Sequence, residues 1–273
     1  MFRLALIQML VEGGEKARNL ERAAQRVVEA ARNGAAVAVL PEVMDLGWTH
    51  PSARSEAGAI PDGETFQSLR ALAREHGLYV CSGLAEKTDS ACFNAAVLLA
   101  PDGKLLLHHR KLNELEIAHD LYAQGDRLGV CHTDLGTIGL MICADAFAQD
   151  RVLSRTLGYM GADIILSPSS WAVPGDHDNS KEPYGELWRS VYSAVATEFS
   201  LWIAGVSNVG RITAGPWQGW NCIGCAQAVA PTGETVLMGP YGVDADTILY
   251  LDVETVPRPA RGCGWGAHWR QPS

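Results

Sequence analysis

Residues 34–41 read GAAVAVLP, and residues 161–168 read GADIILSP. Two further pairs of segments resemble each other in the same order along the chain: LYVCSG at 78–83 with LWIAGV at 201–206, and AVLLAPDGK at 96–104 with QAVAPTGE at 227–234. Three pairs with similar spacing, in one order, indicate an internal duplication. The chain is therefore predicted to consist of two halves built on one plan.

Each half is predicted to alternate strands with amphipathic helices. Residues 3–9 form an apolar run typical of a buried strand, and residues 20–31 carry apolar side chains at helical spacing. A second helix is expected to end at Gly77. Further strands of the first half are expected at 36–40, 78–84, 93–99 and 104–110. The same order begins again at Gly136.

Helices on one face of each mixed sheet leave the opposite sheet face apolar and without a partner. The two halves can cover these faces for each other. This predicts an α/β fold, a four-layer αββα sandwich with an internal pseudo-twofold repeat. Because neither half could bury its inner sheet face alone, residues 1–273 are expected to form a single domain, with a C-terminal tail at about 255–273.

Composition argues against several classes of partner. The chain has 31 acidic and 22 basic residues, a formal net charge of -9 and no cluster of Lys or Arg, so neither nucleic acid nor a membrane surface is expected to bind. The N-terminal apolar run is too short to span a bilayer and no signal-peptide cleavage region follows it, which favours a cytoplasmic protein. Seven cysteines, an odd number spread through apolar stretches, suit reduced thiols better than disulfides.

Three polar residues, Glu42, Lys111 and Cys143, each follow an apolar strand. Each residue alone is weak evidence for catalysis, because a charged residue at a strand end commonly lies in solvent and a cysteine there commonly packs in the core. Together they form a set able to cleave an amide. A carboxylate can take the thiol proton, the thiolate can attack a carbonyl or nitrile carbon, and an ammonium can stabilise the charge that develops on oxygen or nitrogen.

The segments around these residues resemble a known family. LPE at 40–42, HRKLNELE at 109–116 and GLMICAD at 139–145 are similar, in order and spacing, to the three signature blocks of the nitrilase (carbon-nitrogen hydrolase) superfamily. Further similar segments are SPSSW at 167–171, ELWRSVYSAVATEFSLWIAGVSNVG at 186–210 and GCAQAVAPTGE at 224–234, so the resemblance covers almost the whole chain.

The resemblance implies an αββα sandwich, a catalytic triad of Glu42, Lys111 and Cys143, no metal or organic cofactor, and a homodimer or higher homo-oligomer. It also implies a second glutamate shortly after the lysine. Glu116 is the better match and Glu114 the alternative, and for both an ordinary solvated loop acid is the competing interpretation. The implied activity is hydrolysis of a non-peptide C-N bond in a small amide or nitrile, through a covalent thioester, with release of ammonia or amine.

The candidate substrate-binding residues are Asp145, Phe147 and Trp171, with plain core packing as the alternative for Trp171. Two departures from the family pattern concern the substrate. Asn113 stands where many relatives have histidine, and residues 144–149 hold no arginine, which relatives that bind free carboxylates commonly place there. We therefore expect a neutral substrate, and N-carbamoyl amino acid amidohydrolase or omega-amidase activity is the alternative within the family.

Two weaker patterns offer other hypotheses. Cys222 and Cys225 have the spacing of a redox or metal half-site, which would suit a non-enzymatic thiol or binding module, but no second cysteine pair accompanies them. His108 and His109 precede Lys111, so a Cys-His pairing is a rival mechanism. Structural histidines are the favoured interpretation.

Overall fold

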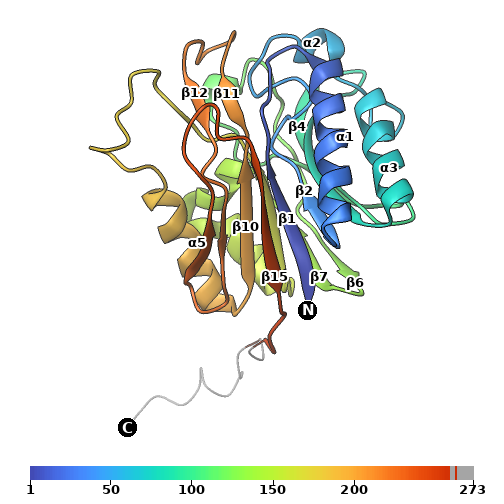
Figure 1. The fold of residues 1–273 in the computed structure, drawn as a ribbon, viewed down its shortest axis with the longest axis vertical. Helices are drawn as coiled ribbons and strands as arrows, with labels where there is room; N and C mark the ends of the chain where they lie inside the picture. The colour runs from blue at the N-terminus through green and yellow to red at the C-terminus, as the bar shows by residue number, and fades with distance from the viewer. Residues whose placement is uncertain (259–261, 263–273) are drawn as a thin grey trace.

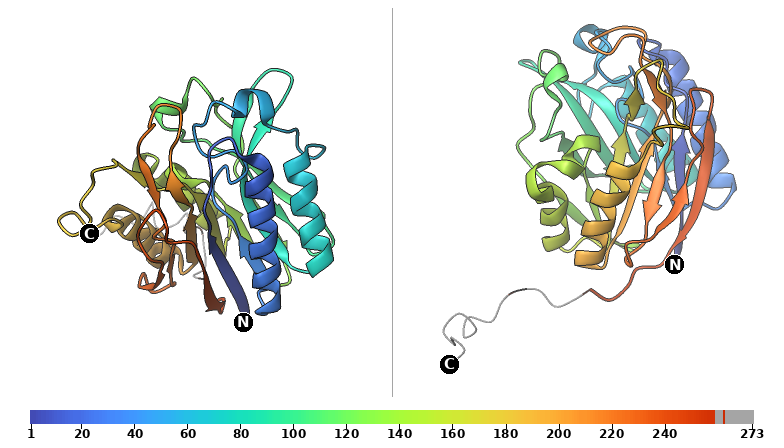
Figure 2. Two further views of the ribbon diagram at one scale, coloured as in Figure 1. Left: turned by 45° about the horizontal axis from the view of Figure 1, so that its top comes forward. Right: turned by 90° about the vertical axis from the view of Figure 1, so that its left-hand side faces the viewer.

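The structure is a computed structural model of the chain, and it describes residues 1–258 and residue 262 (Figure 1). Most of the predicted C-terminal tail, including Cys263, lies outside the described residues. Two six-stranded sheets form the centre of the molecule. Helices cover the outer face of each sheet, and the four layers are visible in Figures 1 and 2. The predicted αββα sandwich is confirmed.

The first sheet has the strand order β15-β1-β2-β3-β4-β5. Its strands are β1 (Phe2–Gln8), β2 (Val37–Val39), β3 (Tyr79–Lys87), β4 (Cys92–Leu99), β5 (Leu105–Arg110) and β15 (Thr247–Val253). The second sheet has the order β14-β13-β10-β8-β7-β6. Its strands are β6 (Val130–Thr133), β7 (Gly136–Leu140), β8 (Ile164–Ser169), β10 (Trp202–Ser207), β13 (Gln227–Val229) and β14 (Thr235–Met238).

The helices and a small third sheet complete the described fold. The longer helices are α1 (Lys16–Arg32), α3 (Glu64–His76), α4 (Val152–Tyr159) and α5 (Glu186–Phe199). The shorter ones are α2 (Ala53–Glu56) and the 3-10 turns η1 (Glu116–Ala118), η2 (Cys143–Phe147) and η3 (Gln149–Arg151). The third sheet pairs β11 (Val209–Arg211), β12 (Asn221–Ile223) and β9 (Ala172–Val173). No helix of the described residues is long and apolar enough to cross a membrane.

The internal duplication predicted from the sequence is present in the strand topology. In the first half β1, β2 and β3 run parallel and β4 and β5 continue antiparallel, and β7, β8, β10, β13 and β14 repeat this pattern in the second half. The three similar sequence pairs fall on β2 and β8, β3 and β10, and β4 and β13. A register shift in the strand pairing also recurs: between Leu98 and Leu99 where β4 pairs with β5, and between Ala228 and Val229 where β13 pairs with β14.

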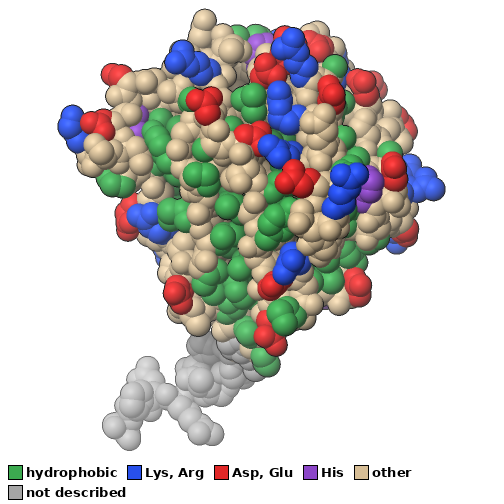
Figure 3. Space-filling model, in the orientation of Figure 1, with side chains coloured by type: hydrophobic (Ala, Val, Ile, Leu, Met, Phe, Trp, Pro, Cys, Tyr) green, Lys and Arg blue, Asp and Glu red, His purple; other side chains and the backbone are tan. Residues whose placement is uncertain are grey.

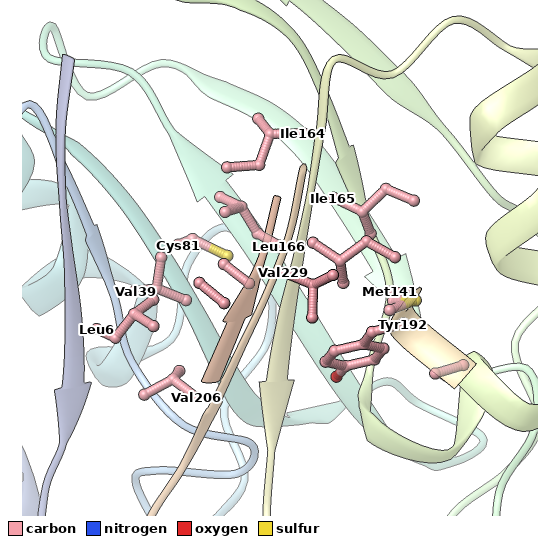
Figure 4. Close-up of a cluster of buried hydrophobic side chains, with 14 of the residues drawn as sticks. Leu6, Val39, Cys81, Met141, Ile164, Ile165, Leu166, Tyr192, Val206 and Val229 are labelled. Carbon is pink, nitrogen blue, oxygen red and sulfur yellow. The ribbon is translucent and has the colours of Figure 1, made fainter. Parts of the chain in front are cut away.

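The strands of the first sheet are apolar on both faces because each face meets another layer. Along β1, Leu4 and Leu6 belong to the cluster shared with the second sheet, whereas Ala5 and Ile7 belong to the cluster under the helices. Figure 4 shows Leu6, Val39 and Cys81 of the first sheet in one cluster with side chains of the second, among them Leu166, Val206 and Val229. Full burial of each large aliphatic side chain contributes about 1.5–3 kcal/mol.

The helices bury the stripe that their sequence predicts. In α1 the buried residues Asn19, Ala23, Val27 and Ala30 repeat at helical spacing and face the first sheet. Helix α3 ends at His76 and is capped by Gly77, whose φ of 65° is the left-handed conformation that favours glycine. On the face shown in Figure 3, basic side chains are interspersed with acidic ones.

Candidate active site

The three residues expected to carry chemistry come together at one end of the two sheets. Glu42 follows β2, Lys111 follows β5 and Cys143 follows β7. The Lys111 Nζ lies 2.8 Å from Glu42 Oε1, and the backbone N–H of Glu42 donates to the Ser169 carbonyl across the two sheets at 3.2 Å. Lys111 and Cys143 line a cavity of about 350 Å³. Strands of both halves therefore supply this site.

A sharp turn presents Cys143 to the cavity. Strand β7 ends at Leu140, and the 3-10 turn η2 begins at Cys143, whose φ of 43° is rare for a residue other than glycine. Such backbone strain persists where the surroundings enforce it, and it gathers at functional sites. The backbone N–H of Ser170 lowers the pKa of the Cys143 thiol, although burial outweighs it.

Lys111 lies between two carboxylates. Its Nζ donates to Glu42 Oε1 at 2.8 Å and to Glu114 Oε1 at 3.0 Å, and all three side chains are almost fully buried. Of the two candidate glutamates, the structure places Glu114, and not the preferred Glu116, beside Lys111. At a spacing of three residues Glu114 folds back across the turn onto Lys111, whereas Glu116 is exposed at the start of η1. Asn94 of β4 donates its Nδ2 to Glu42 Oε1 at 2.6 Å and to Glu114 Oε2 at 3.0 Å.

Burial and these charges set the proton affinities of the cluster. Burial raises the pKa of Glu42, Lys111 lowers it and Glu114 raises it, and the pKa remains above its ordinary value. Burial also raises the pKa of Cys143, and the Glu42 carboxylate adds to this more than Lys111 opposes it. Burial lowers the pKa of Lys111, but the two carboxylates outweigh it and the pKa lies well above its ordinary value. At neutral pH the thiol is thus protonated and the ammonium is charged.

Asp145, a candidate substrate-binding residue, is not among the residues that line the cavity. It is fully buried, and its Oδ1 accepts the backbone N–H groups of Leu112 and Asn113 at 3.1 and 2.7 Å. Its Oδ2 accepts the N–H of Ile142 at 2.9 Å and lies 2.7 Å from His109 Nε2. Asp145 therefore ties the segment after Lys111 to the turn that carries Cys143.

The polar residues near Asp145 also make hydrogen bonds within the protein. His109 is buried, and its second ring nitrogen lies 3.1 Å from the Arg127 carbonyl, as expected for a structural histidine. His108 contacts Glu86 at 2.8 Å. Asn113 donates its Nδ2 to the Ala144 carbonyl at 2.6 Å. This amide holds the residue directly after the candidate nucleophile.

Six aromatic side chains line the cavity. Those lining it are Trp48, Phe147, Trp171, Tyr184, Trp188 and Trp217, so the candidate substrate-binding residues Phe147 and Trp171 both line it. Trp171 stacks on Trp188 with ring centroids 4.8 Å apart. The charged lining residues of the described chain are Lys111, Glu182 and Glu186, with no arginine among them. Arg189 forms an ion pair with Glu186 at 2.5 Å.

Comparison with known proteins identifies the family to which this site belongs. Residues 3–254 match the family described as carbon-nitrogen hydrolase. The chain belongs to the carbon-nitrogen hydrolase family. This carbon-nitrogen hydrolase is 33% identical over 201 residues to a nitrilase from Pyrococcus abyssi, covering 72% of this chain and 74% of the relative. It is 28% identical over 264 residues to an omega-amidase from Bos taurus, covering 93% and 88% of the two chains.

Solved structures of the superfamily have the same fold. An amidase from Nesterenkonia sp. AN1 superimposes on this carbon-nitrogen hydrolase with a TM-score of 0.78 at 19% identity, over 93% of this chain and 94% of the other. A superfamily protein from Xanthomonas campestris gives a TM-score of 0.76 at 19% identity, over 92% and 89%. The resemblance inferred from the signature blocks is confirmed, and the protein is an enzyme of the amidase and nitrilase type.

The sequence missed several residues of the carbon-nitrogen hydrolase site. Asn94 had one usable signal, an amide inside the apolar strand sequence CFNAAVLL. No sequence signal marked Trp48 and Trp217, because only the fold brings their loops to the cavity. The Cys222 and Cys225 pattern gains no support, since both thiols are free and buried. Within residues 1–258 no group of three metal-binding side chains comes together.

Proposed function

We propose that this carbon-nitrogen hydrolase cleaves the amide bond of a small molecule with Cys143 as nucleophile, Glu42 as general base and acid, and Lys111 as oxyanion partner. The observation that carries the proposal is the placement of a strained cysteine and a buried ammonium on the wall of one cavity, with a buried carboxylate bonded to that ammonium. Glu114 holds Lys111 from its other side.

The charges of the cluster support a reaction in two halves. Glu42 takes the proton from the Cys143 sulfur as the sulfur attacks the carbonyl carbon, and the oxygen that becomes negative is stabilised by Lys111. When the C-N bond breaks, Glu42 returns the proton to the departing nitrogen, which leaves as ammonia or amine and a thioester remains. Water, deprotonated by Glu42, then attacks the thioester, and the carboxylic acid and the free thiol are released.

The cavity wall supports a neutral substrate with an apolar or aromatic body. Six aromatic rings line it, and no arginine of the described chain does. A free carboxylate would need a paired cation there, and Lys111 is already paired with Glu42 and Glu114. Omega-amidase or N-carbamoyl amino acid hydrolysis is therefore the second candidate, favoured by the omega-amidase relatives. A nitrile substrate is compatible with the same nucleophile.

The remaining features of the proposal come from the family resemblance and the sequence. We propose a cytoplasmic homo-oligomer that acts without metal or organic cofactor and binds neither nucleic acid nor membrane. A single domain is supported by the cluster of buried side chains that joins both sheets.

One screen tests the proposed function. Ammonia release is measured with neutral aliphatic and aromatic amides, nitriles, an N-carbamoyl amino acid and a dicarboxylate monoamide, with Cys143→Ala as the control. We expect turnover of a neutral amide that Cys143→Ala abolishes. A kcat/KM advantage of about tenfold or more for either acid, roughly 1.4 kcal/mol in transition-state binding, contradicts the neutral preference. No turnover of any compound, with redox cycling of Cys222 and Cys225, supports a thiol module instead.

A further inference from the structure

Asn94 lies inside the buried cluster, and the reaction described above gives it no role. It stands on β4 and is 1% exposed. Its amide nitrogen, which has two hydrogens, lies 2.6 Å from Glu42 Oε1 and 3.0 Å from Glu114 Oε2. The opposite orientation of the amide would set its oxygen against two carboxylate oxygens, so the nitrogen must face them.

Hydrogen bonds give the two oxygens of Glu42 different roles. Oε1 accepts from Lys111 Nζ at 2.8 Å and from Asn94 Nδ2 at 2.6 Å. Oε2 is buried without a hydrogen-bond partner among the described residues. An oxygen that already accepts two such bonds is a poor proton acceptor. Oε2 is therefore the oxygen of Glu42 left to take a proton.

We propose that Asn94 is a positioning residue for hydrolysis, which holds Glu42 with Oε1 toward Lys111 and leaves Oε2 for the Cys143 proton. The inference rests on the proposed function, because it takes Glu42 as the base. The backbone of Asn94 adds to this role, since its carbonyl accepts the backbone N–H of Lys111 at 2.9 Å. Strand β4 is paired on both sides, by β3 and β5, and so provides a rigid support.

The role predicts a shift in pH dependence as well as a loss of rate. Asn94 donates to the charged form of Glu42 and so lowers the pKa of that carboxyl. Without this donor Glu42 keeps its proton to higher pH, and the acid limb of kcat/KM should move upward by about one pH unit or more. A residue that only supports the fold would lower activity without moving that limb.

The experiment compares Asn94→Leu and Asn94→Ala with the wild type. Asn94→Leu is nearly isosteric, and the smaller Asn94→Ala serves if the leucine variant does not fold, as judged by circular dichroism and thermal melting. Thr137→Val is the matched control, because it removes the hydrogen bond of a buried hydroxyl to the exposed His132 at the start of β7, away from Glu42 and Glu114. For each protein the pH profiles of kcat/KM and of Cys143 alkylation by iodoacetamide are measured.

We expect both Asn94 variants to move the acid limbs of the kcat/KM and alkylation profiles to higher pH. Thr137→Val should keep the wild-type midpoints. An unshifted midpoint in a folded Asn94 variant overturns the role of Asn94. The proposed function fails in a different way, by wild-type turnover that survives Cys143→Ala. Turnover that needs Cys143, combined with unshifted Asn94 profiles, overturns only the inference about Asn94.

Discussion

At the scale of single residues, the chemistry depends on a thiol that burial makes less acidic. The pKa of Cys143 is raised by burial and by the Glu42 carboxylate, so the ionised thiolate is disfavoured before the reaction begins. Reactivity must then come from transfer of the proton to Glu42 during attack. This separates Cys143 from an ordinary exposed thiol, whose reactivity follows its own ionisation.

Cys143 should therefore be alkylated by iodoacetamide before the more exposed Cys92 and Cys131. Burial raises the pKa of each of those two thiols to about 11, the Asp45 carboxylate adds to this at Cys92, and the Cys92 thiol donates to the Ala53 carbonyl and not to a carboxylate. Peptide mapping after brief labelling measures the order. Glu42→Gln should slow labelling of Cys143 and leave Cys92 and Cys131 unchanged. Preferential labelling elsewhere, with Cys143 untouched, contradicts the assignment.

Lys111→Ala and Glu42→Gln should each lower kcat by about 10²–10³, the scale seen when an oxyanion donor is removed. The effects should not add in the double variant, because the residues act as one unit. In the wild type the raised pKa of Glu42 places the acid limb of kcat/KM above the ordinary glutamate value, since the base is lost as pH falls through that pKa. Losses within a few fold reject these roles.

Asp145→Asn tests the structural role assigned to Asp145. The amide can still accept two N–H groups through its oxygen, but its NH₂ group then meets the N–H of Ile142. We expect a loss of about 2–4 kcal/mol in the free energy of unfolding, measured by urea denaturation. Asp252→Asn, at an exposed ion pair with Arg3, is the control and should leave the urea midpoint nearly unchanged.

The residues that sequence could predict and those it could not differ in a physical way. Glu42, Lys111 and Cys143 each follow an apolar strand, and a sheet brings such ends together, so their pattern was readable. Which glutamate meets Lys111 depends on the direction in which the turn after Lys111 folds back, and that direction brings Glu114 to it. Asp145 likewise meets its hydrogen-bond partners, the backbone N–H groups of Leu112, Asn113 and Ile142, only when the chain is folded.

At the scale of elements, the loop between β11 and β12 has no counterpart in the first half. The first half joins β3 directly to β4, whereas the second half inserts β11 and β12 between β10 and β13. The insertion carries Trp217 to the cavity, where it stacks on Trp220 at 4.1 Å and meets Trp48 edge-on at 5.0 Å. The repeated elements were predictable by comparing the halves, and this insertion was not.

Trp217→Ala should therefore lower kcat/KM for an aromatic amide more than for a short aliphatic one. The lost contact between rings is worth about 0.5–1.5 kcal/mol beyond the area buried. Trp202→Ala is the control, because its indole donates to the Glu254 carbonyl and does not line the cavity. Equal losses for the two substrates in Trp217→Ala would argue that Trp217 only shields the cavity from water.

In the whole molecule, the two sheets pack face to face, and a strand that follows the second half also joins the sheet of the first half. Strand β15 follows the second half in sequence, yet it pairs antiparallel with β1 from Phe2 to Gln8. The second sheet has the matching crossing, because β6 follows β5 of the first half and pairs antiparallel with β7. Sequence predicted that the inner sheet faces need each other, and β15 adds a backbone connection between the halves.

The two halves should consequently unfold as one cooperative unit. Leu6 belongs to the cluster shared by the sheets, so Leu6→Ala should cost about 2–5 kcal/mol and lower the urea midpoint of the whole chain. Tryptophan fluorescence reports mainly on the second half, which holds Trp171, Trp188, Trp202, Trp217 and Trp220, while far-ultraviolet circular dichroism reports on both halves. The two signals should shift together in Leu6→Ala, at a fixed protein concentration because association would also move the midpoint. Val236→Ala, at an exposed position, should leave both signals in place. A fluorescence transition that keeps its wild-type midpoint in Leu6→Ala would mean that the second half holds its structure without the first, and the chain would then consist of two domains.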